Sequence, residues 1–112
     1  MALTLSEDSR DGGMVVVKMS GRFDAAAVAE AEAVLLPRAG ESGVVRIILD
    51  CADLEYVASA GLRVFLQVVK ALKEREARLY VAGMREMVLS VLKMTGFLSF
   101  MEARATVEEC LA

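Results

Sequence analysis

Histidine is absent from this sequence of 112 residues. Histidine is the side chain best suited to proton transfer near neutral pH and the commonest zinc ligand. Its absence therefore excludes most hydrolase and zinc-enzyme mechanisms. Cysteine is scarce as well, because Cys51 and Cys110 are the only two and they do not form a C-x-x-C pair. The sequence predicts two reduced thiols.

An excess of basic residues and a long apolar run are also missing. There are 13 Lys and Arg against 16 Asp and Glu, a net charge of -3, so nucleic acid is not an expected partner. The apolar run from Met87 to Met94 contains Ser90 and Lys93 and falls far short of the roughly 20 residues of a membrane span. The early charges Glu7 and Asp8 do not fit a signal peptide. We expect a cytoplasmic protein without membrane insertion.

What the sequence does contain is material for one buried core. Hydrophobic residues make up 56% of the chain and charged residues 26%, which is too apolar for a disordered segment. The length is that of one small domain, and no linker or internal repeat divides it. We expect residues 1–112 to form a single domain.

Short apolar runs alternate with amphipathic stretches along the chain. The pattern predicts strands at residues 2–5, 14–19, 44–49, 78–82 and 98–101. It predicts helices at 25–36 and 59–72, a third from Met87 that ends before Gly96, and a short final helix that starts at Thr106. Residues 50–58 are predicted to form a loop. Asp24 is placed as an N-cap of the first helix, and Pro37 is expected to end that helix. Thr106 and Glu109 have the spacing of a capping box.

This order of elements predicts an α/β fold. The turn signal Asp11-Gly12-Gly13 joins the first two strands as an antiparallel hairpin. The later strands alternate with helices, which is typical of right-handed strand-helix-strand crossovers. We expect a mixed β-sheet of about four or five strands with helices packed on it.

One serine stands among small residues where a loop enters the most amphipathic helix. In the plainest interpretation Ser59 caps this helix and Gly61 allows close packing against the sheet. The segment Ala58-Ser59-Ala60-Gly61 also resembles the end of a G-x-S-x-G nucleophile elbow, but Val57 replaces the first glycine and no histidine can act as base.

A receiver-like phosphoacceptor is another alternative, because Asp50 follows a predicted buried strand. Such a site needs further carboxylates to hold magnesium and a lysine after a late strand. The sequence places neither of them there.

Three segments, taken in their order and spacing, resemble the bacterial anti-sigma factor antagonist (anti-anti-sigma factor) family of single STAS domains. Residues 20–24, SGRFD, are similar to the family's G-x-[LFI]-D. Residues 50–64 are similar to its strand and loop with D-S-[ST]-G-L leading into a helix. Residues 94–97, MTGF, are similar to a late [MLI]-[ST]-G-[LF] segment. The resemblance implies the STAS fold.

The resemblance also implies the site. Ser59 matches the serine that the family's partner kinase phosphorylates, and Asp24 matches an aspartate placed beside it. Ala58 and Ala60 stand where the family has an acidic residue and a serine or threonine, so Ser59 is the only hydroxyl in the turn. The implied site-supporting and partner-binding residues are Asp24, Ala58, Ala60, Gly61, Leu62 and Arg63. Arg63 is either a solvated charge or a salt bridge to the partner.

The implied function is transcription regulation by partner switching, without enzyme activity in this chain. The unphosphorylated form would bind an anti-sigma factor with serine kinase activity and release the sigma factor. Phosphorylation of Ser59 would end binding, and a metal-dependent serine phosphatase would restore it. No cofactor is expected, because ATP and magnesium would belong to the kinase. The alternative within the same fold is a non-phosphorylated STAS subunit of a transport system or signalling assembly.

Overall fold

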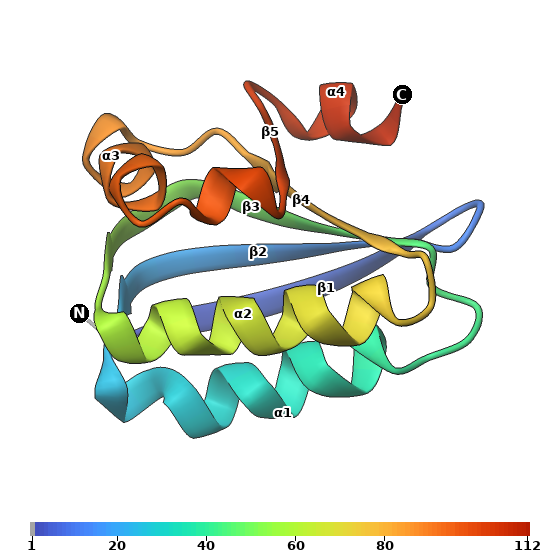
Figure 1. Cartoon of the computed structure of the whole chain (residues 1–112), viewed down its shortest axis with the longest axis horizontal. Coiled ribbons are helices and arrows are strands. Elements are labelled where there is room, and N and C mark those ends of the chain that lie inside the picture. Colours follow the sequence, from blue (N-terminus) through green and yellow to red (C-terminus); the bar gives the residue numbers. More distant parts are fainter. Residues whose placement is uncertain (1) are drawn as a thin grey trace.

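The computed structural model describes residues 2–112, which form one sheet with helices packed against it (Figure 1). In chain order the elements are β1 (Thr4–Arg10), β2 (Met14–Phe23), the 3-10 helix η1 (Ala25–Ala27), α1 (Val28–Ala39), β3 (Arg46–Val57), α2 (Ser59–Lys73), β4 (Arg78–Ala82), α3 (Glu86–Met94), the 3-10 helix η2 (Phe97–Ser99), β5 (Glu102–Arg104) and α4 (Val107–Leu111). Within residues 2–112, no helix has the length and apolar character needed to span a membrane.

The sheet has five strands in the order β1-β2-β3-β4-β5. β1 and β2 form an antiparallel hairpin, and each later neighbouring pair is parallel. Gly12 and Gly13 turn the hairpin with φ of 78° and 79°, a conformation that glycine adopts without a steric penalty. The predicted α/β fold, its mixed sheet and its opening hairpin are confirmed.

The two faces of the sheet carry two apolar clusters. α1 and α2 lie together against one face, and α4 lies on the other (Figure 1). The main cluster joins alternate residues of the central strands to Leu35 of α1 and Phe65 of α2, as expected from the two-residue period of a strand. α3 adds Val88 and Leu92 to this core. The smaller cluster joins Val16, Ile48, Ala82 and Cys110 under α4.

Both cysteines are free and buried. Cys51 belongs to the main core and Cys110 to the cluster under α4. Burial is the largest cause that raises the pKa of each thiol above its ordinary value, because the apolar surroundings disfavour the thiolate. Neither thiol is placed to act as a nucleophile in the folded protein.

β3 is twice as long as its sequence pattern predicts. The predicted loop at residues 50–58 is wrong, because the strand continues to Val57 and only Ala58 separates it from α2. Its partner β2 is nearly as long, and the two pair from Met14 opposite Arg46 to Phe23 opposite Val57. Two register shifts in β2 and β3 interrupt the alternation of buried and exposed residues. A strand with such irregularities does not show the simple period of two in its sequence.

Several other predicted boundaries are wrong. The first two strands, predicted at 2–5 and 14–19, are Thr4–Arg10 and Met14–Phe23. Pro37 lies inside α1, which continues to Ala39, and the helix starts later because residues 25–27 form η1. Pro37 has no N–H to donate to the helix, yet the helix continues beyond it to Ala39, which is buried in the main core. The strand predicted at 98–101 is replaced by η2, and the strand that pairs with β4 is Glu102–Arg104.

Other boundaries agree with the sequence. β4 spans residues 78–82 as predicted, and α2 begins at Ser59. The capping box at α4 is present: the Thr106 Oγ1 accepts from the Glu109 backbone N–H at 3.2 Å, and the Glu109 carboxylate accepts from the Thr106 N–H at 3.1 Å.

Arg75, after α2, ties together the ends of three elements. Its Nε donates to the carbonyl of Ala39 at 3.0 Å, and its Nη2 donates to the carbonyl of Val44 at 3.0 Å. These carbonyls belong to the end of α1 and to the segment leading into β3. The guanidinium therefore supplies donors for backbone groups that neither helix nor sheet satisfies.

We predict that Arg75→Met lowers the free energy of unfolding by about 1–3 kcal/mol, because hydrogen bonds from a charged donor are lost. Urea denaturation followed by circular dichroism measures this change. Lys70→Met, which removes an exposed cation from α2, is the matched control and is expected to change stability by less than about 0.5 kcal/mol. Equal stabilities of the two variants would contradict the role given to Arg75.

Candidate functional site

The sequence-predicted site forms where β2 and β3 end side by side. Phe23 and Val57 are the last paired residues, and the Ala58 N–H donates to the Phe23 carbonyl at 2.9 Å. Beyond this pair the two chains separate, one toward Asp24 and η1 and the other into α2 at Ser59. The parallel pairing therefore brings Asp24 and Ser59, 35 positions apart in sequence, to the same end of the sheet.

Ser59 is exposed and is the first residue of α2. The N-cap position is held by Ala58 in an extended conformation, and no side chain caps the helix. The interpretation of Ser59 as a capping residue is therefore wrong. Within residues 2–112, the Ser59 hydroxyl has no hydrogen-bond partner, so it is free to react or to contact another molecule.

Gly61 is buried against Phe23. A Cβ at this position would lie 2.9 Å from the Phe23 Cγ and 3.0 Å from the Phe23 carbonyl oxygen, which is too close. The Phe23 ring itself meets Phe65 edge to face, with centroids 5.4 Å apart and planes at 73°. The glycine thus lets the first turn of α2 rest directly on the end of β2, which confirms the close packing expected there.

Asp24 caps η1. Its Oδ1 accepts from the Ala26 N–H at 3.1 Å, and the residue is partly buried. Asp24 was predicted to cap the first α-helix; it caps the 3-10 helix that precedes α1, and α1 itself follows Ala27 without a side-chain cap. In the described part of the chain, the Asp24 carboxylate makes no hydrogen bond to Ser59, although both residues follow the last paired residues of β2 and β3.

The remaining predicted residues line the first turn of α2. Ala58 and Ala60 are partly buried and bring no polar group to the turn. Leu62 packs partly against the main core, and its N–H donates to the Ala58 carbonyl at 3.0 Å. Arg63 is exposed. Because the N–H groups of residues 59–61 lack partners within the helix, this end of α2 carries partial positive charge.

A cation at this end of the sheet was not anticipated from the sequence. The guanidinium of Arg22 lies 4.2 Å from the centroid of the Tyr56 ring. The register of β2 and β3 places these two residues opposite each other. Arg22 and Tyr56 each stand one residue before the end of their strand. Their contact could be predicted from the sequence only if β3 was correctly extended to Val57.

The alternative chemistries do not fit this geometry. Asp50 lies in the middle of β3, not at its end, and its carboxylate accepts from the Ala52 N–H at 3.3 Å. The receiver-like interpretation is therefore wrong about the place of Asp50. In residues 2–112 no group of three Cys, Asp or Glu side chains is arranged to hold a metal ion.

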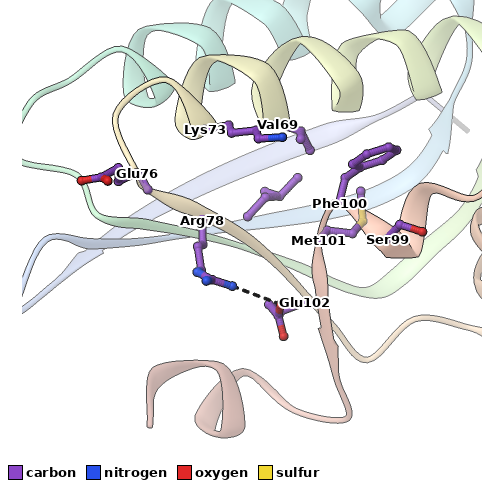
Figure 2. A pocket seen from close by; sticks show the side chains of 10 residues that line it. Val69, Lys73, Glu76, Arg78, Ser99, Phe100, Met101 and Glu102 are labelled. Atoms are coloured by element: carbon purple, nitrogen blue, oxygen red, sulfur yellow. Dashed lines mark hydrogen bonds and ion pairs between the residues drawn. The ribbon is translucent and has the colours of Figure 1, made fainter.

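A groove of about 430 Å³ lies at the other end of α2 (Figure 2). Its lining includes Lys73, the exposed ring of Phe100 and Arg78, which pairs with Glu102 at 3.3 Å. Lys73 is 14 residues after Ser59, which corresponds to about 21 Å along the helix axis. The groove is therefore separate from the Ser59 turn.

We predict that Gly61→Ala lowers the free energy of unfolding by at least about 1 kcal/mol, because the overpacking against Phe23 outweighs the better helix propensity of alanine. Thermal and urea denaturation measure the change. Gly43→Ala is the matched control, since a Cβ there has no neighbour within 4 Å. If the two variants are equally stable, the close approach of Gly61 to Phe23 is not a constraint.

The chain matches the family model described as the STAS domain over residues 7–110. BtrV of Bordetella bronchiseptica, whose name marks it as a candidate anti-sigma factor antagonist, is 34% identical over 87% of this chain and 82% of its own length. The anti-sigma-B factor antagonist of Staphylococcus epidermidis is 32% identical over 82% of this chain and 84% of its own length.

Solved structures share the fold. The unphosphorylated form of SpoIIAA, described as an anti-sigma factor antagonist, has a TM-score of 0.78 at 19% identity and covers 96% of this chain and 94% of its own. The phosphorylated form of SpoIIAA from Bacillus has a TM-score of 0.78 at 21% identity, with 96% of each chain covered. The family model spans nearly all of the sequence and two relatives exceed 30% identity, so this chain belongs to the STAS domain family.

Proposed function

We propose that this chain is an anti-sigma factor antagonist whose binding is switched by phosphorylation of Ser59. In its unphosphorylated form it binds an anti-sigma factor with serine kinase activity, and the sigma factor is released. Residues 1–112 act as one STAS domain in the cytoplasm, as a binding protein without catalytic activity. The observation that carries the proposal is the free, exposed hydroxyl of Ser59 at the start of α2.

The first turn of α2 is suited to a hydroxyl that another protein modifies. In the proposed step the Ser59 oxygen attacks the γ-phosphorus of ATP held by the kinase, its proton passes to a base of the kinase, and ADP leaves. Ala58 and Ala60 leave room around the hydroxyl and offer no competing acceptor. Because Ala58 supplies no carboxylate, the kinase must contribute the group that orients the hydroxyl.

The modified form is expected to keep its fold. Phosphoserine carries about -1.5 to -2 charges, and at the first residue of α2 this charge meets unpaired N–H groups and the positive end of the helix. The change therefore affects the surface that the partner contacts. A dianion placed in the interface opposes docking through its desolvation and through repulsion of acidic groups on the partner. A metal-dependent serine phosphatase would remove the phosphate and restore binding.

The names of the relatives support this proposal over the alternative. Two relatives above 30% identity are named for anti-sigma factor antagonism, and SpoIIAA, which shares the fold, exists in phosphorylated and unphosphorylated forms. In the alternative, the chain is a non-phosphorylated STAS subunit of a transport system or signalling assembly. The two functions differ in whether a negative charge at position 59 prevents the chain from binding its partner.

We predict that a pull-down from lysate of the source organism retains a kinase-type protein with the wild type and Ser59→Ala, and loses it with Ser59→Glu. The negative charge of glutamate stands in part for the phosphate. Mass spectrometry identifies the bound proteins and the phosphorylation of Ser59. Ser90→Glu, on the exposed side of α3, introduces the same charge elsewhere and is expected to retain the partner.

Two results would reject the phosphorylation switch. In the first, the wild type and all three variants retain the same transporter or scaffold subunits, and mass spectrometry finds no phosphate on Ser59. The other is equal loss of the partner from Ser59→Glu and Ser90→Glu, which would show a nonspecific effect of charge.

A further inference from the structure

Arg63 follows Ser59 by four residues on α2, and both side chains are exposed. Residues at this spacing lie on the same side of a helix, with Cβ atoms about 5–6 Å apart. Within residues 2–112, Arg63 takes part in none of the ion pairs, which involve Arg10, Lys18, Arg38, Arg78, Arg85 and Arg104 as cations. Its guanidinium is therefore available to a new anion.

The helix itself offers Arg63 no acidic neighbour. The residues three and four positions away on either side are Ser59, Ala60, Leu66 and Gln67. None of them carries a charge in the unmodified protein. Phosphorylation of Ser59 would create the one anion at pairing distance along the helix.

Two other charged groups, Arg22 and Asp24, belong to this end of the sheet. Arg22 lies over the ring of Tyr56, and the Asp24 carboxylate accepts the Ala26 N–H. Asp24 is the nearby group of like charge, and it opposes a phosphate on Ser59. Arg63 is the cation that shares a side of α2 with residue 59, whereas Arg22 lies on β2 against Tyr56.

We propose that Arg63 is the intramolecular counter-ion of phosphorylated Ser59, an inference that rests on the proposed phosphorylation switch. The orientation is favourable, because an anion N-terminal to a cation at i, i+4 agrees with the direction of the helix dipole. A guanidinium also donates two parallel hydrogen bonds to phosphate oxygens, which an ammonium cannot do in the same geometry.

This pairing makes one modification change two features of the surface. In the unmodified protein Arg63 projects from the first turns of α2 as a free cation that an acidic group of the partner can meet. In the phosphorylated protein the same guanidinium pairs with the phosphate on residue 59 for part of the time. Phosphorylation then adds an anion and makes the neighbouring cation less available to the partner.

The test uses full-length protein with phosphoserine installed at position 59 during translation, so that no kinase is needed. Phosphorus NMR titration gives the second pKa of the phosphate, which is about 6 for phosphoserine. We expect this pKa to be about 0.2–0.4 unit lower in the wild type than in Arg63→Gln, since the cation favours the dianion. Arg63→Lys is expected to recover part of the difference.

The double variant Arg63→Gln with Gln67→Arg keeps the net charge and moves the cation one turn away from residue 59. It is expected to titrate like Arg63→Gln. An unchanged phosphate pKa in Arg63→Gln, or a full recovery in the double variant, would overturn the proposed pairing. Because the phosphate is installed without a kinase, this result is independent of the pull-down, which tests whether Ser59 is modified and controls a partner.

Discussion

The parallel pairing of β2 and β3 as far as Phe23 and Val57 is the constraint on which the candidate site depends. It carries two distant parts of the chain to one end of the sheet and leaves a single residue, Ala58, before α2 begins. The Ala58 N–H is held by the Phe23 carbonyl, and the Phe23 ring lies under Gly61. The first turn of α2 is therefore positioned by backbone hydrogen bonds and core packing, and not by the side chain of Ser59.

The residues that stabilise the first turn of α2 are therefore different from the serine that is proposed to be phosphorylated. A serine that capped the helix would have its hydroxyl oxygen engaged by a backbone N–H of the first turn. Here Ser59 has no such role, so its hydroxyl is available for modification while the fold stays unchanged. The small residues around it serve the same end, because they keep polar competitors and bulk away from the turn. The proposed switch consequently acts through surface charge.

Sequence patterns located the turn around Ser59 but not the second half of β3, which leads into it. β4 and the start of α2 follow from clear apolar periods, and the segment around Ser59 was found from its small residues and family resemblance. The second half of β3 was missed because register shifts and exposed charges break the alternation that identifies a strand. The same error hid the contact between Arg22 and Tyr56, which depends on tertiary register. The role of Ser59 as a cap was also misjudged, because only backbone geometry shows that Ala58 occupies that position.

The most direct test of a surface switch on an unchanged fold is a residue-by-residue comparison of backbone amide NMR spectra of the unmodified and Ser59-phosphorylated protein. We predict that shifts are confined to residues 58–63 and to the adjoining end of β2 with Asp24. Strand and core amides elsewhere should keep their positions. Shifts that extend through β4 and α4, or a loss of dispersed signals, would contradict this view and show that phosphorylation reorganises the domain.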